Sequence, residues 1–311
     1  MKKLLKENFS QIIFTILVLF FLVNMIIFPA KFIQVGLNGI SAWAFNVLPS
    51  VLPFMFFTRV LSSLGQIEKL PFGKFTRKVF GTPSISFYTF LMAILSGYPV
   101  GSKMIADSYE MGKITRNDAF RMSSFCSTSG PMFIIGAVGV GMFHSAQIGY
   151  ILFISHVLSA LINGIIYKKI KVKEEEVKNI KEVEEKKFNL SDIVLSSTLS
   201  ILSVGAIIAI FFVIIECFSP IFSLLPKDVA YFLQGVIEIT KGCLSLSTLS
   251  NVKFGVILAS FVISFGGIST LIQSITLLNK VKMPVRLFAL QKLTHGIISA
   301  LITLALVFIF L

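Results

Sequence analysis

Residues 85–111 read ISFYTFLMAILSGYPVGSKMIADSYEM and are apolar on both sides of a polar centre. Two glycines and one proline fall within residues 96–101, and a continuous helix does not accommodate that combination. Basic segments flank the stretch at residues 74–78 and 113–121. Short basic loops of membrane proteins lie on the cytoplasmic side, so the two flanks belong on the same side. We therefore predict that residues 85–111 enter the membrane and return as a re-entrant helical hairpin, which needs cover from protein or a water-filled cavity.

The composition of the whole chain supports a membrane environment. Of its 311 residues, 55% are hydrophobic and 14% are charged, which leaves too little polar surface for a soluble globule of this length. Several uncharged runs reach the roughly 20 residues that span a bilayer core. They are Phe9–Phe28, Ser145–Tyr167, Ile193–Ile215 and Leu293–Leu311. The first run is too long for a signal-peptide core and lacks a cleavage site, so we interpret it as a retained anchor.

The order of the elements predicts two related halves, each with a hairpin, a broken helix and a plain helix. The first hairpin opens inside and the second opens outside, so the halves have inverted topology. The predicted units are scaffold spans 1–84, a first repeat 85–167, a charged linker 168–189, a scaffold span 190–227 and a second repeat 228–311. The fold class is therefore an all-α polytopic membrane protein, with about seven transmembrane helices and two re-entrant helical hairpins in an inverted repeat.

Four helix breaks carry the candidate site, at residues 96–102, 127–131, 238–242 and 264–270. A broken helix exposes unpaired amides at the start of its second piece, and these suit carboxylate or phosphate groups. Glycine and serine also allow close packing of membrane helices, which remains the alternative for each break. The predicted substrate-binding residues are Ser96, Gly97, Lys103, Ser127, Ser129, Gly130, Glu238, Thr240, Lys241, Gly266, Gly267, Ser269, Thr270 and Gln273.

Charged side chains at membrane depth are functional candidates by default. Lys103 and Asp107 are four residues apart on one helical face, so they either pair or snorkel to the inner interface. Glu238 and Lys241 either contact the solute or cap and pair locally. We interpret His156, in the middle of an uncharged run, as a neutral packing residue.

Other function classes find no support in the sequence. The net charge of +13 arises from basic residues in short loops between spans, so we expect no nucleic-acid partner. Three scattered cysteines give neither a disulfide framework nor metal-ligand spacing, and we expect no metal and no cofactor. A coupling cation and a homo-oligomer remain open. The chain carries no recognisable arrangement of nucleophile, base and oxyanion group, so we do not expect an enzyme.

Four motifs together resemble the sporulation integral membrane proteins of the YlbJ type. They are Leu95–Lys103 (LSGYPVGSK), Ser129–Gly136 (SGPMFIIG), Gly235–Gly242 (GVIEITKG) and Ser264–Thr270 (SFGGIST). The resemblance covers roughly residues 35–305. That family belongs to the nucleoside-recognition, or Gate, domain proteins, which are similar to concentrative nucleoside transporters.

The resemblance implies a multi-pass protein in a membrane around the forespore, which passes dipicolinate during endospore formation. It also implies that Glu238 matches the glutamate of the second hairpin in the nucleoside transporters. The first hairpin departs from their pattern, with Ser96–Pro99 in place of a Gln-Thr-Glu run. Loss of a carboxylate beside Lys103 and Lys241 suits an anion, so we predict a transporter of a small organic anion. The alternatives are a nucleoside–cation symporter and a non-transporting membrane assembly protein that docks a partner through the charged linker.

Overall fold

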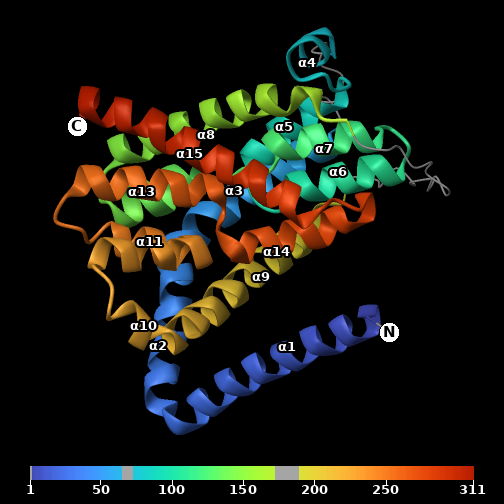
Figure 1. The fold of residues 1–311 in the computed structure, drawn as a ribbon. Coiled ribbons are helices and arrows are strands. Elements are labelled where there is room, and N and C mark those ends of the chain that lie inside the picture. The colour runs from blue at the N-terminus through green and yellow to red at the C-terminus, as the bar shows by residue number, and fades with distance from the viewer. Residues whose placement is uncertain (1, 65–72, 172–188) are drawn as a thin grey trace.

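The computed structural model describes residues 2–64, 73–171 and 189–311, and every regular element in these ranges is a helix (Figure 1). Most of the predicted charged linker, residues 172–188, lies outside the described residues. The elements before the linker are α1 (Lys2–Ile27), α2 (Pro29–Ala42), η1 (Trp43–Val47), α3 (Leu48–Ser63), α4 (Gly73–Phe80), α5 (Ile85–Ser96), α6 (Val100–Glu110), α7 (Arg116–Cys126), η3 (Met132–Met142), α8 (Ala146–Ile166) and η4 (Tyr167–Lys169). Those after it are α9 (Leu190–Cys217), α10 (Ser219–Phe222), α11 (Lys227–Ile237), α12 (Ile239–Leu246), α13 (Val252–Phe265), α14 (Gly267–Leu278), η5 (Asn279–Val281) and α15 (Val285–Phe310).

Length and composition make several of these helices membrane spans. Among the described residues, five are long and apolar enough: Pro29–Ser63, Ala146–Lys169, Leu190–Cys217, Val252–Val281 and Val285–Phe310. A sixth is counted if α4 and α5, which are bent by 86°, form one span. Large apolar side chains point outward from them, such as Leu199 on α9 and Leu301 on α15. The predicted all-helical, multi-pass membrane class is confirmed, whereas the seven crossings and the inverted repeat stay predictions.

Both predicted hairpins are helical segments that fold back on themselves. In the first, α5 and α6 are joined by Gly97–Pro99, and a Cβ on Gly101 would lie 2.9 Å from the Ala93 Cβ. In the second, α11 and α12 pack so closely that a Cβ on Gly242 would lie 2.0 Å from the Gly235 Cα. The break in this second hairpin, predicted at residues 238–242, is shorter than predicted, because α12 already begins at Ile239.

The first hairpin opens at the end of the bundle where basic side chains gather. There the Arg121 guanidinium donates hydrogen bonds to the carbonyl oxygens of Gly81, before α5, and Ile170, after η4. Lys280, after α14, forms an ion pair with Glu110 at the end of α6 (2.7 Å). Both legs of the first hairpin therefore end on the same side, together with the end of α14.

The second hairpin opens at the other end of the bundle. α12 leads by a short connection to the start of α13, where Lys253 Nζ lies 5.9 Å from the Phe308 ring near the end of α15. Gln147, at the start of α8, donates to the Phe310 carbonyl oxygen at the same end. Figure 1 shows the C-terminus at this end, away from α4.

Two longer helices are broken where the sequence predicts interruptions. α7 ends at Cys126 and continues as the π-helix η3, while α13 and α14 are separated by Gly266 alone. The last residues predicted in the fourth break, Ser269 and Thr270, are helical. Thr115 followed by Asp118 three residues later predicts a capping box, and the structure has this box at the start of α7. The breaks therefore lie inside the bundle rather than at its ends.

A second group of helices packs beside the hairpins and is called the scaffold below: α2, η1, α3 and α9. Gly39 allows α2 to approach α9, because a Cβ there would lie 2.9 Å from the Ala209 Cα. The Trp43 ring of η1 lies against Gly205 of α9. The hairpins, both broken helices, α8 and α15 are called the hairpin unit.

Candidate functional site

Glycines allow the helix breaks to come into contact. Gly97 (φ 75°) lies against the second break, because a Cβ there would approach the Gly130 amide nitrogen to 2.9 Å. Gly267 (φ 67°) lies against the second hairpin, since a Cβ there would be 3.3 Å from the Gly235 carbonyl oxygen. Left-handed backbone and the lack of room both favour glycine at these two positions. Breaks that are far apart in the sequence are therefore neighbours in the fold.

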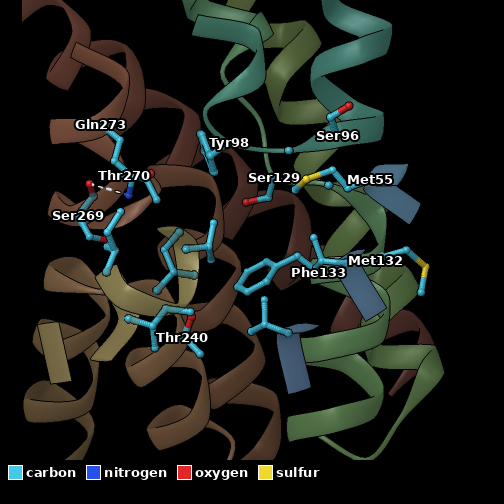
Figure 2. A pocket seen from close by; sticks show the side chains of 18 of the residues that line it. Met55, Ser96, Tyr98, Ser129, Met132, Phe133, Thr240, Ser269, Thr270 and Gln273 are labelled. Atoms are coloured by element: carbon cyan, nitrogen blue, oxygen red, sulfur yellow. Dashed lines mark hydrogen bonds between the residues drawn. The ribbon is translucent and has the colours of Figure 1, made fainter. Parts of the chain in front are cut away.

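One cavity lies where the four breaks meet, between the scaffold and the hairpin unit. It contains about 780 Å³ of empty space, counting its open side. Figure 2 shows Ser269, Thr270 and Gln273 on one side of it and Ser96 and Ser129 on the other. The lining comprises Val47, Val51, Phe54, Met55, Leu95, Ser96, Gly97, Tyr98, Ser129, Gly130, Met132, Phe133, Val204, Ile207, Ile208, Glu238, Ile239, Thr240, Ser269, Thr270 and Gln273.

The predicted site residues divide into two groups. Those that line the cavity are Ser96, Gly97, Ser129, Gly130, Glu238, Thr240, Ser269, Thr270 and Gln273. Ser127, Lys241, Gly266 and Gly267 lie within the predicted breaks without lining it, and Lys103 follows the first break on α6. The fold therefore places hydroxyl-bearing residues from all four breaks around the cavity, but neither of the two lysines.

The two lysines predicted to contact the solute have other surroundings. Lys103 is exposed on α6, and Asp107, its possible partner in one of the two alternatives, pairs with Lys280 (3.7 Å). Lys241 points its ammonium at the Phe212 ring of α9, 5.1 Å from the ring centroid. Spacing along one helix identifies a common face, but it does not identify the helices that cover that face.

Glu238 is a buried carboxylate at the tip of the second hairpin. Its two oxygens accept hydrogen bonds from the amides of Thr240 (3.0 Å) and Lys241 (2.7 Å). These bonds cap the first turn of α12, where a negative charge is favourable. The local-capping interpretation is therefore confirmed, and the same carboxylate also lines the cavity.

The other three helices that begin at the breaks lack such a cap. α6, η3 and α14 have no side-chain hydrogen bond at the N-cap among the described residues. Their first amides carry partial positive charge and have no partner within the helix. Two hydroxyl groups of the second break, Ser127 Oγ and Thr128 Oγ1, are buried without a partner in the described part of the chain. The uncapped helix starts thus leave backbone hydrogen-bond donors at the breaks, whereas the Ser127 and Thr128 hydroxyl groups do not line the cavity.

A buried lysine that the sequence analysis missed lies directly behind the cavity wall. Lys292 on α15 is 2% exposed. Its Nζ lies 2.5 Å from the Tyr98 hydroxyl, 2.7 Å from the Ser127 carbonyl oxygen and 3.4 Å from His295 Nδ1. Because Tyr98 lines the cavity, the lysine is connected to the cavity through that hydroxyl group.

Two histidines extend this cluster to α8. The Ser129 amide donates to His156 Nε2 (3.0 Å), so the proton of this neutral ring is on Nδ1, which donates to Ser264 Oγ (2.7 Å). His295 Nε2 donates to the His156 carbonyl oxygen (3.1 Å), which leaves His295 Nδ1 as an acceptor toward Lys292. His156 is therefore more than a packing residue, because it joins the second and fourth breaks to the lysine.

The sequence did contain a signal for Lys292. An ionisable residue inside an apolar helix is a functional candidate, and this lysine lies about two turns after the start of α15. The predicted membrane-spanning run begins only at Leu293, so the sequence suggested that Lys292 lies at the end of a span rather than inside it. Tyr98 carries no such signal, because its role depends on α15 passing the first hairpin.

Comparison with known proteins agrees with the four motifs. Over an alignment of 342 positions, the chain is 27% identical to the sporulation integral membrane protein YlbJ of Bacillus subtilis (strain 168). The match covers 96% of this chain and 84% of that protein, so it includes both hairpins and both broken helices. No family model and no solved structure matches. Over nearly its full length, the chain is therefore similar to a sporulation integral membrane protein of the YlbJ type.

Proposed function

We propose that this chain is a membrane transporter of a small organic anion that acts in sporulation, the process in its relative's name. The observation that carries the proposal is the cavity at which helix breaks from both halves of the chain meet. Discontinuous helices around a cavity between packed units are a recurrent construction of secondary transport sites. The scaffold and the hairpin unit would move against each other to open the site to either side.

The groups around the cavity favour an anion. Among the described residues, Glu238 is the one carboxylate in the lining, and two amides already hold its oxygens. The uncapped starts of α6, η3 and α14 present hydrogen-bond donors, and Lys292 places a basic group behind Tyr98. Helix N-termini and basic side chains are the usual partners of carboxylates.

Dipicolinate is the substrate that we expect. It is a flat aromatic ring with two carboxylates, and it needs an apolar slot with polar groups at its edges. Val51, Phe133 and Ile208 supply apolar surface in the lining, while Ser129 and Ser269 supply hydroxyl groups. A few placed polar groups in an apolar surround are sufficient to orient a small ligand.

A cavity-filling substitution tests the proposal. Val204 of α9 lines the cavity, so Val204→Trp fills it from the scaffold side and leaves the helix breaks unchanged. Leu202→Trp is the matched control, because Leu202 is on the same helix and faces outward. Vesicles with the unsubstituted chain or Leu202→Trp should take up radiolabelled dipicolinate, and Val204→Trp should lose most of that uptake. No uptake by the unsubstituted chain, or normal dipicolinate content in spores of a deletion strain, would overturn the proposal.

A nucleoside–cation symporter is the second candidate, because Glu238 places a carboxylate in the lining. Uridine uptake that follows a sodium or proton gradient, and is lost in Glu238→Gln, would favour it. A glutamine side chain offers one oxygen to two amides, so this variant also weakens the α12 cap by about 1 kcal/mol. Its amount in the membrane must therefore be measured alongside. Dipicolinate uptake without uridine uptake would exclude this candidate.

A further inference from the structure

We propose that Lys292 is a proton-binding site linked to anion binding, so that the solute and a proton are carried together. The inference rests on the proposed function and names its coupling ion. It is carried by the contacts of Lys292 with Tyr98, Ser127 and His295, which lie at the first break, the second break and the last helix.

These contacts satisfy Lys292 in either protonation state. As an ammonium, Nζ donates to the Tyr98 hydroxyl, the Ser127 carbonyl oxygen and His295 Nδ1. As a neutral amine, it donates to the last two, and its lone pair accepts the Tyr98 O–H. The change requires only rotation of the Tyr98 hydroxyl proton, which can turn to the Ser129 side chain beside it. Neither state leaves a buried polar group without a partner, which would be costly.

The surroundings supply no opposite charge. In the part of the chain that the structure describes, no carboxylate forms an ion pair with Lys292. The titratable groups that face it are Tyr98 from the first hairpin, His156 from α8 and His295 from its own helix. α14 carries no charged residue, Lys253 lies at the start of α13, and Arg121 in the middle of α7 donates to the carbonyl oxygens of Gly81 and Ile170. An unpaired ammonium is unfavourable in a buried site, so the empty site favours the neutral amine.

An anion in the cavity would provide the missing charge. A carboxylate beside Tyr98 stabilises the ammonium form of Lys292, and protonation strengthens anion binding by the same factor, because linkage is reciprocal. The amine lone pair takes a proton from water on the side where the solute enters. The ammonium returns a proton to water where the solute leaves, and no other bond changes. One proton therefore accompanies each bound anion.

The pH dependence of anion affinity in the purified full-length chain tests this inference, with dipicolinate as the probe. Its carboxylates stay ionised above about pH 6, so the probe itself does not titrate there. Above the pH at which the Lys292 amine of the empty site becomes neutral, the affinity for dipicolinate should fall about tenfold for each unit by which the pH rises. Vesicles loaded with a pH-sensitive dye should also acidify during dipicolinate uptake.

Three variants separate charge from proton exchange. Lys292→Met keeps the length of the side chain but cannot bind a proton, so its affinity should be weak and independent of pH. Lys292→Arg stays charged at every pH tested, so it should bind dipicolinate without the pH slope and without acidification. Lys253→Met removes an exposed lysine outside the site and should keep the slope of the unsubstituted chain.

The outcomes distinguish the two proposals. Dipicolinate binding without pH dependence, or an unchanged slope in Lys292→Met, would overturn the proton site and leave the transporter intact. No dipicolinate binding at any pH would overturn the proposed function and the linked proton site together. The profile of the unsubstituted chain requires no variant, so it decides the question even if a Lys292 variant fails to fold.

Discussion

Gly101 shows how closely the first hairpin packs on the first broken helix. A Cβ at this buried position would lie 1.7 Å from the carbonyl oxygen of Cys126, and backbone atoms cannot move aside as a flexible side chain can. Gly101→Ala should therefore lower the free energy of unfolding by about 1–3 kcal/mol or more. The measurement is the thermal midpoint of the solubilised protein, followed by size-exclusion chromatography.

Gly36→Ala provides the matched control for that prediction. Gly36 is also helical, but no described atom of a neighbouring element lies within 4 Å of a Cβ placed there. Alanine favours helix over glycine, so this variant should be neutral or slightly more stable. Equal losses of stability at Gly36 and Gly101 would contradict the packing explanation.

At the scale of residues, the sequence predicted contacts between neighbours and missed contacts between distant segments. The Thr115–Asp118 capping box is confirmed because both partners lie within one helical turn. Of the two alternatives for Lys103 and Asp107, pairing is not found among the described contacts, because Lys280 reaches Asp107 from another part of the chain. The cluster around Lys292 is likewise formed only by tertiary packing, which no local pattern specifies.

At the scale of elements, composition located all four helix breaks but overestimated the length of three. Glycine and proline mark the first break, which the structure confines to Gly97–Pro99 between α5 and α6. The breaks at Glu238 and Gly266 are single residues. One capping carboxylate, or one glycine in the left-handed region, is enough to end one helix and begin the next.

The orientation of the hairpins can be tested by labelling single cysteines. Lys78→Cys and Lys113→Cys place exposed thiols on either side of the first hairpin, and Lys253→Cys places one near the second. The three native cysteines are buried and are replaced by alanine for this experiment; they are Cys126, Cys217 and Cys243. An impermeant maleimide should reach positions 78 and 113 from the same side of the membrane, and position 253 from the other. Labelling of 78 and 113 from opposite sides would mean that residues 85–111 cross the membrane once.

At the scale of the whole molecule, the cavity lies at the boundary between the scaffold and the hairpin unit. Within the hairpin unit, Ser260 of α13 and Ser299 of α15 are joined by a hydrogen bond of 2.7 Å. Across the boundary, Ser96 of α5 donates to Thr58 of α3 at 3.2 Å. Alternating access requires the second contact to break while the first persists, because rigid bodies slide past each other at their boundary.

A disulfide across that boundary should therefore stop transport. The two hydroxyl oxygens of Thr58 and Ser96 are close enough that sulfur atoms in their place would be within reach of a bond. Oxidised Thr58→Cys with Ser96→Cys should lose dipicolinate uptake, and a reductant should restore it. Ser260→Cys with Ser299→Cys is the matched control, since its disulfide joins two helices of one unit and should leave uptake intact. If both oxidised pairs transport equally well, the boundary between α3 and α5 does not move, and the solute must reach the cavity by smaller rearrangements of the hairpin tips.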